Sequence, residues 1–210
     1  MVCPNFIGYT FAHLTAATAF TAAGTFIKLP LSFIINTLVI LLTFVILFAL
    51  MFLSPSPLKY ALFVAFTLLL GSTLEPLVAQ LKQKGLLLEV LLTTIGIFFT
   101  MALLGFADKD NFLGLGPYLF AGLIGIIIAQ LLLFLLVSMG VISKETFNTN
   151  RKPILLIALA IFAIYTSFDV QVLKRHAREC RSKPDYINES IGLYLDLLNI
   201  FTSFGDFVGN

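Results

Sequence analysis

Long apolar runs alternate with short polar breaks along the whole chain. The runs are about 20 residues long or longer, and there are seven of them. They cover residues 6–27, 31–53, 60–80, 86–106, 115–141, 153–173 and 187–208. An α-helix needs about 20 apolar residues to cross the hydrocarbon core of a bilayer. The pattern therefore predicts seven transmembrane helices in a single membrane domain that covers residues 1–210.

The last run differs from the others because it carries a polar stripe. Its polar positions are 7, 3, 4 and 3 residues apart, which places them on one face of a helix. They are Glu189, Asp196, Asn199, Ser203 and Asp206. About eleven apolar residues, at roughly −0.5 kcal/mol each, barely offset the polar side chains. We expect this semi-polar helix to shelter its stripe against the bundle, or to enter the membrane only part-way as a re-entrant helix.

Composition supports a membrane protein and excludes other classes. Of the 210 residues, 59% are hydrophobic and 11% are charged. Backbone polar groups must be satisfied within lipid, which leaves helices or a closed barrel, and the runs are continuous rather than alternating. There is no basic patch with interleaved aromatic residues, so we expect no nucleic-acid partner. The two cysteines have no disulfide or metal-ligand spacing, so we expect no cofactor. We predict an all-α membrane protein that contacts the lipid bilayer.

Charged breaks flank the sixth run on both sides. Before it, we expect residues 144–152 to form a loop and Pro153 to open the helix, at a position where proline is tolerated. After it, residues 174–185 hold five of the chain's 13 Lys and Arg residues.

Asp169 and Asp196 lie within apolar runs on opposite sides of this basic loop. An aspartate at a helix centre costs roughly 2.5–3.5 kcal/mol on insertion scales, and such residues usually mark function. At 1.5 Å per residue, Asp169 lies roughly 7 Å and Asp196 roughly 14 Å from the loop. The depths match if the sixth helix continues to Ala177, with its basic side chains reaching the interface. We therefore expect the two carboxylates to meet.

Two carboxylates in contact share a proton and titrate as a unit. Loss of the proton would repel the two helices and open a polar path. Carboxylate oxygens are also the ligands that calcium prefers, which makes Asp169 and Asp196 candidate calcium ligands. This chemistry favours a proton-gated cation leak, with calcium as the permeant ion. The alternative is a structural role, in which each aspartate is paired with a neighbouring backbone or side-chain group and only stabilises the helix bundle.

Six further residues are secondary candidates, mainly for the lining of such a path. They are Asp206, Glu75, Asn199, Glu189, Lys59 and His13. Glu75 precedes Pro76 in the third run and either lies near membrane depth or marks the end of that helix. His13 in the first run is either a hydrogen-bonded structural residue or a proton relay.

Proteolysis is a remote alternative use of two membrane aspartates. The pair Tyr165 and Asp169, with Gly205-Asp206, faintly resembles the motifs of presenilin-like intramembrane aspartyl proteases. However, Tyr165 is not adjacent to Asp169, and the supporting Pro-Ala-Leu segment is absent. Gly-x-Ser-x-Gly and His-Glu-x-x-His motifs are also absent. We therefore expect that the protein is not an enzyme.

Three segments resemble the Bax-inhibitor family, also called the Lifeguard or transmembrane Bax-inhibitor-motif family. They are residues 168–173 (FDVQVL), 184–187 (PDYI) and 193–201 (LYLDLLNIF). The resemblance implies a seven-helix bundle with a central sixth helix and a pH-sensitive calcium leak gated by Asp169 and Asp196. The resemblance also relates Glu75, more loosely, to a Glu that some members of the family carry.

The resemblance also implies a cellular setting. It implies suppression of cell death, lowered calcium stores, and Bcl-2-type proteins or calcium-release channels as partners. The expected membrane is the endoplasmic reticulum or Golgi in a eukaryotic or viral setting and the plasma membrane in a bacterium. The second interpretation is a non-conducting adaptor that regulates cell-death or calcium-channel partners by helix contact.

Two departures from the family pattern concern the proposed gate. Val170 stands where the family usually has Thr, which removes a hydroxyl beside the first aspartate. Bacterial relatives carry an Arg cluster before the third helix that can latch this aspartate. Here residues 54–59 (SPSPLK) offer only Lys59 as a substitute.

Overall fold

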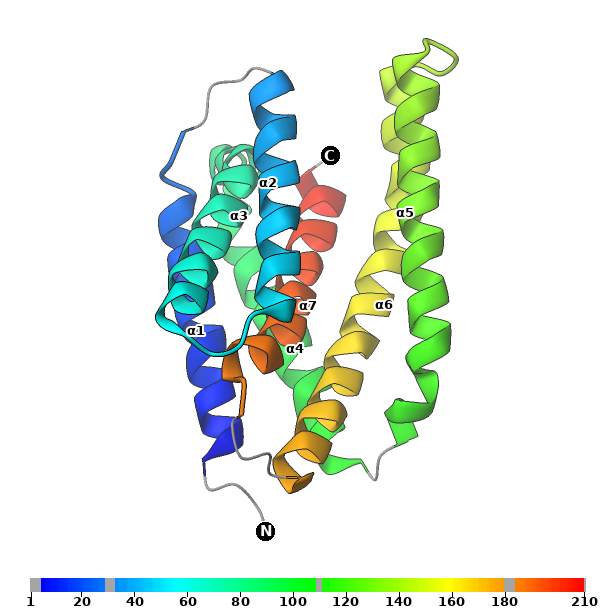
Figure 1. Ribbon diagram of the computed structural model, residues 1–210. Coiled ribbons are helices and arrows are strands. Elements are labelled where there is room, and N and C mark those ends of the chain that lie inside the picture. Colours follow the sequence, from blue (N-terminus) through cyan, green and yellow to red (C-terminus); the bar gives the residue numbers. More distant parts are fainter. Residues whose placement is uncertain (1–4, 29–32, 109–110, 180–183, 210) are drawn as a thin grey trace. The chain divides into compact units, whose positions relative to one another are not determined.

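The computed structural model describes residues 5–28, 33–108, 111–179 and 184–209, and these residues form helices and connecting turns without any strand (Figure 1). The helices are α1 (Phe6–Gly24), α2 (Phe33–Phe52), α3 (Pro57–Gln83), α4 (Leu87–Ala107), the short 3-10 helix η1 (Asn111–Leu115), α5 (Gly116–Ser138), α6 (Lys144–Glu179) and α7 (Tyr186–Gly209). Each of the seven expected spans overlaps one of the seven α-helices that the described residues form.

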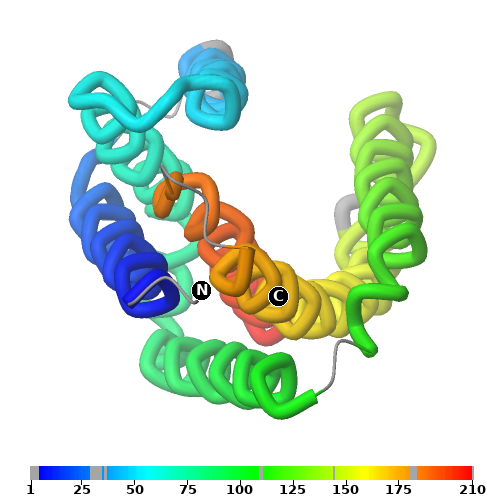
Figure 2. The backbone as a smooth tube through the Cα atoms, turned by 60° about the horizontal axis from the view of Figure 1, so that its bottom comes forward, coloured from blue at the N-terminus to red at the C-terminus, as the bar shows by residue number. Residues whose placement is uncertain are grey.

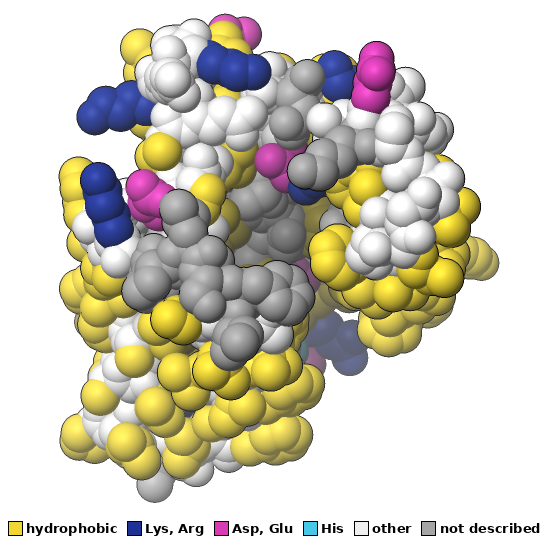
Figure 3. Space-filling view, turned by 90° about the horizontal axis from the view of Figure 1, so that it is seen from above, with side chains coloured by type: hydrophobic (Ala, Val, Ile, Leu, Met, Phe, Trp, Pro, Cys, Tyr) yellow, Lys and Arg dark blue, Asp and Glu magenta, His cyan; other side chains and the backbone are white. Residues whose placement is uncertain are grey.

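Five of these helices, α3 to α7, are long and apolar enough to cross a membrane. In α2 the described apolar segment Thr37–Phe52 is shorter, and α1 is rich in Ala and Thr, which are less hydrophobic than Leu or Ile. Large apolar side chains are exposed along the helices, most of all on α5, whose most apolar 18-residue window is only 6% buried. Figure 3 shows hydrophobic side chains over large parts of one face, with a few Lys, Arg, Asp and Glu side chains among the other atoms. The all-helical membrane class is confirmed.

The helix α6 is longer than the sequence indicated, and two predictions at its start were wrong. Residues 144–152 are helical rather than a loop, and Pro153 lies inside α6 rather than at its first turn. The helix begins earlier because Ser143 caps it: the Ser143 hydroxyl accepts the backbone N–H of Thr146 at 3.1 Å. At the other end α6 continues to Glu179, so the expected extension to Ala177 is confirmed. Residues 180–183 of the predicted basic loop lie outside the described residues.

The chain divides into two compact units, and α6 and α7 each contribute to both. Unit 1 comprises residues 1–82 and 173–194, which include α1, α2, α3, the end of α6 and the first part of α7. Unit 2 comprises residues 83–172 and 195–210, which include α4, α5, most of α6 and the rest of α7.

In unit 1, helices α1 and α3 are in backbone contact at two glycines. A Cβ atom at Gly71 would lie 2.1 Å from the Thr21 carbonyl oxygen, and one at Gly24 would lie 2.3 Å from the Leu68 carbonyl oxygen. Figures 1 and 2 both show the two helices side by side. Small residues at such crossings allow the close approach that stabilises helix pairs in lipid.

The substitution Gly71→Ala is expected to destabilise the protein by about 1–3 kcal/mol, because the added methyl group must push α1 and α3 apart. The measurement is the midpoint of thermal unfolding in detergent. The matched control is Gly96→Ala in the middle of α4, where an added Cβ meets nothing within 4 Å. This control should be neutral or slightly stabilising, because Ala is a better helix former than Gly. Equal midpoints for the two variants would contradict the backbone contact.

Candidate functional site

Asp196 lies buried in the middle of α7, in unit 2. Its exposed fraction is 4%, and its Oδ2 atom has no hydrogen-bond partner among the described residues. A buried carboxylate oxygen without a partner is costly, and most buried polar groups in proteins are satisfied. Asp196, one of the two aspartates that the sequence singled out, is therefore a buried acid with an unsatisfied carboxylate oxygen.

Asp169 belongs to α6 and lies in the same unit. It is partly buried, and its charge interacts with that of Asp196. The phenol of Tyr165, one helical turn before Asp169, lies within the field of both carboxylates. Tyr165 and Asp169 of α6 thus lie close enough to Asp196 of α7 to share its electrostatic environment.

Two buried side chains next to Asp169 hold α6 against its neighbours. The Ser167 hydroxyl donates to the Met101 carbonyl of α4 at 2.6 Å. The Gln171 amide oxygen accepts the backbone N–H of Leu113 in η1 at 3.2 Å, and its amide nitrogen donates to Asp108 at 3.4 Å. Both side chains are fully buried. These contacts restrict the rotation of α6 about its own axis on both sides of Asp169. Sequence reasoning gave them no role, although Gln171 lies in a segment that carried the family resemblance.

The polar stripe of α7 contacts α6 at both of its ends. In unit 1, both carboxylate oxygens of Glu189 lie 2.9 Å from Nδ1 of His176. In unit 2, Asp206 forms an ion pair with Arg151. Between them, the Asn199 side-chain nitrogen donates to the Leu195 carbonyl of its own helix at 2.8 Å. The α7 helix is continuous over 24 residues, about 36 Å at 1.5 Å per residue, which is long enough to cross a hydrocarbon core.

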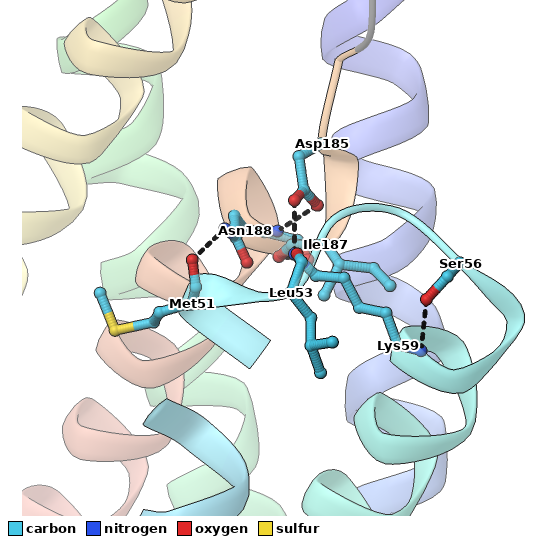
Figure 4. Close-up of polar contacts among 8 residues, drawn as sticks. Met51, Leu53, Ser56, Lys59, Asp185, Ile187 and Asn188 are labelled. Atoms are coloured by element: carbon cyan, nitrogen blue, oxygen red, sulfur yellow. Dashed lines mark hydrogen bonds and ion pairs between the residues drawn. The ribbon is translucent and has the colours of Figure 1, made fainter. Parts of the chain in front are cut away.

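Lys59 is fully buried in unit 1 and pairs with an aspartate to which sequence reasoning assigned no partner (Figure 4). Its ammonium forms an ion pair with Asp185 and donates to the Leu53 carbonyl at 2.7 Å. The other carboxylate oxygen of Asp185 accepts the backbone N–H of Asn188 at 3.2 Å, as in a helix N-cap. The side-chain amide nitrogen of Asn188 donates to the Met51 carbonyl at 3.3 Å. These contacts join the end of α2 and the starts of α3 and α7, and we call them the Lys59 clasp.

Glu75 and His13 both belong to unit 1. Glu75 is partly buried within α3, and the helix continues beyond it to Gln83, so the interpretation of Glu75 as a helix end was wrong. The proline that follows does not end the helix. His13 Nδ1 lies 2.8 Å from the Tyr9 carbonyl, and its ring lies 5.8 Å from Tyr60 and 5.9 Å from Tyr186 between centroids. These surroundings favour a structural histidine.

Long apolar helices with buried polar side chains between them define a multi-pass helical membrane protein. A family model described as the inhibitor of apoptosis-promoting Bax1 matches residues 3–210. The chain therefore belongs to the Bax inhibitor-1 family.

Individual relatives come from bacteria and from yeast. The inner membrane protein YbhL of Escherichia coli is 29% identical over 155 residues, which cover 71% of this chain and 62% of the relative. An uncharacterised membrane protein of Streptococcus pyogenes is 27% identical over 151 residues, which cover 70% and 62%. Bax inhibitor 1 of Schizosaccharomyces pombe is 27% identical over 146 residues, which cover 69% and 50%. The matched segment thus spans half to about three fifths of these relatives.

Proposed function

We propose that this chain is a pH-sensitive, calcium-permeable leak in which Asp169 and Asp196 form the gate. One observation carries the proposal. Asp196 is buried inside an apolar helix with an unpartnered carboxylate oxygen, and the charge of Asp169 acts on it. An ionisable group that is buried at membrane depth is retained mainly where it serves function.

In the proposed mechanism, one proton shared between Asp169 and Asp196 keeps α6 and α7 together. When the proton leaves, two like charges face each other in a medium of low dielectric, where their repulsion is much stronger than in water. The helices separate, and calcium passes along the polar stripe of α7, where carboxylate oxygens replace part of its hydration shell. Protons therefore close the leak, and efflux rises with pH.

The contacts of α6 support a central place for this helix in the mechanism. Within unit 2, α6 contacts α4 through Ser167 and α7 through Arg151. It contacts α5 where Ile161 approaches Gly122: a Cβ atom added there would lie 2.8 Å from Cδ1 of Ile161. A movement of α6 would thus change its contacts with three other helices of the unit.

The family suggests where such a leak would act. We propose the endoplasmic reticulum or Golgi as its membrane in a eukaryotic or viral setting and the plasma membrane in a bacterium. In the first setting, lowering stored calcium would suppress cell death, and Bcl-2-type proteins or calcium-release channels are the partners to test. One bacterial relative is named an inner membrane protein, which supports the plasma membrane in a bacterium, and a yeast relative is named Bax inhibitor 1, which supports a link to cell death in a eukaryote.

The test is calcium efflux from proteoliposomes that contain only this protein, measured at pH 6 and pH 8 beside protein-free liposomes. We expect efflux above the protein-free rate, and a higher rate at pH 8. A purified protein that is folded but gives no efflux at either pH would overturn the leak. The adaptor function would then be the better proposal, because helix contacts with a partner need no conduction.

A further inference from the structure

A charged contact joins α6 and α7 in unit 2, away from Asp169 and Asp196. The Arg151 guanidinium near the start of α6 donates to Oδ2 of Asp206 near the end of α7. The two side chains are 28% and 21% exposed, so water reaches the contact only partly. Asp206 lies ten residues after Asp196, which is about 15 Å along α7 at 1.5 Å per residue.

The contact stands at the end of the polar stripe of α7 within this unit. Asp196, Asn199, Ser203 and Asp206 follow one another along the same helical face, and Ser203 is buried. A cation that moves along this face from Asp196 reaches Asp206 last. The final carboxylate of the stripe is therefore already occupied by a cation that belongs to the protein.

Arg151 is held in place by more than Asp206. Its Cζ atom lies 6.0 Å from the centroid of the Phe147 ring, one helical turn earlier, which is within the range of a cation–π contact. Another positive charge lies at the same end of α7, because the Lys84 ammonium donates to the Gly209 carbonyl at 2.6 Å. A guanidinium stays protonated at all physiological pH values, so this positive charge does not vary between pH 6 and pH 8.

We propose that Arg151 is a tethered counterion that closes the end of the acid-lined path and sets the resting rate of the leak. A divalent cation must displace the guanidinium from Asp206 before it leaves the stripe. This second barrier acts in series with the aspartate pair, and the positive charge that forms it is the same at pH 6 and pH 8. The inference rests on the proposed leak and adds to it the residue that limits its resting flux.

Calcium efflux distinguishes a tethered counterion from an ion pair that only stabilises the fold. Replacing Arg151 with Gln removes the competing cation from Asp206, so calcium efflux should rise about threefold or more. Replacing Asp206 with Asn leaves the positive charge of Arg151 in the path without its strongest partner, so efflux should fall. A contact that only stabilises the fold would shift both variants in the same direction.

The experiment measures calcium efflux from proteoliposomes at pH 6 and pH 8 for the wild type, Arg151→Gln and Asp206→Asn. In Arg151→Gln the rate should rise at both pH values while their ratio stays that of the wild type, because the aspartate pair is intact. Lys152→Gln is the matched control: it removes the neighbouring positive charge of α6 and should leave the rate unchanged.

A chemical version of the test does not depend on the stability of these variants. Arg151→Cys, made in a chain with Cys3→Ser and Cys180→Ser, can be modified after reconstitution with methanethiosulfonates of either charge. A positive reagent should lower efflux and a negative reagent should raise it. Equal effects of the two reagents, or an unchanged rate in Arg151→Gln beside a conducting wild type, would overturn the counterion and leave the leak standing. No efflux from the wild type or from any variant would overturn both.

Discussion

Replacing both Asp169 and Asp196 with Asn is expected to make calcium efflux the same at pH 6 and pH 8. In the wild type, loss of the shared proton opens the path, and a single proton can change the rate by at most about 100-fold across two pH units. Two amides carry no charge at either pH and can hydrogen-bond to each other. The variant should therefore remain at the low rate that the wild type shows at pH 6. The measurement is the ratio of the two initial efflux rates in proteoliposomes.

A control for this variant must remove the same number of carboxylates from elsewhere on α6. Glu145 and Glu179 are both exposed, and Glu179 makes a surface ion pair with Arg175 one turn away. Exposed pairs of this kind contribute little, typically below about 1 kcal/mol. Glu145→Gln/Glu179→Gln should keep the pH dependence of the wild type. If this control lost it as well, or if the Asn variant retained it, the gate would not be Asp169 and Asp196.

The positions of the helices could be predicted from the sequence because lipid imposes a simple rule. A span must be long and apolar, and each of the seven apolar runs overlaps a helix of the described residues. The start of α6 could not be predicted by that rule, because eight of the nine residues from Lys144 to Lys152 are polar and a proline follows them. Outside the hydrocarbon core a helix needs only a cap and local hydrogen bonds, and Ser143 supplies the cap. Hydropathy detects the part of a helix that lies in lipid but does not predict how far the helix continues outside it.

The candidate site was predictable only in part, for a related reason. The cost of an acid in an apolar run singles out Asp169 and Asp196 from sequence alone. The cations that meet the other acids could not be assigned in the same way. Arg151 was expected in a loop, whereas it reaches Asp206 from within a helix, and Lys59 meets Asp185 126 residues away. Such pairings depend on how helices far apart in the chain come together, and no local pattern encodes that.

The Lys59 clasp leads to the largest expected effect on stability. Lys59 is fully buried, and Asp185 is 23% exposed. Removing one partner of a buried ion pair typically costs 3–5 kcal/mol because it leaves the other charge uncompensated. Water reaches Asp185 in part, so we expect Lys59→Met to destabilise the protein by about 2–4 kcal/mol. For a chain of this size that corresponds to a fall of about 5–15 °C in the midpoint of thermal unfolding in detergent.

The double variant Lys59→Met/Asp185→Asn separates the charge from the packing. Asn retains an oxygen that can accept the N–H of Asn188, so the start of α7 keeps its cap. It also removes the stranded carboxylate charge, so the double variant should regain a large part of the lost stability. Lys28→Met is the matched control, since Lys28 is exposed in the same unit and its loss should cost almost nothing. A double variant no more stable than Lys59→Met would mean that the lysine stem and the Leu53 contact, rather than the ion pair, hold α2, α3 and α7 together.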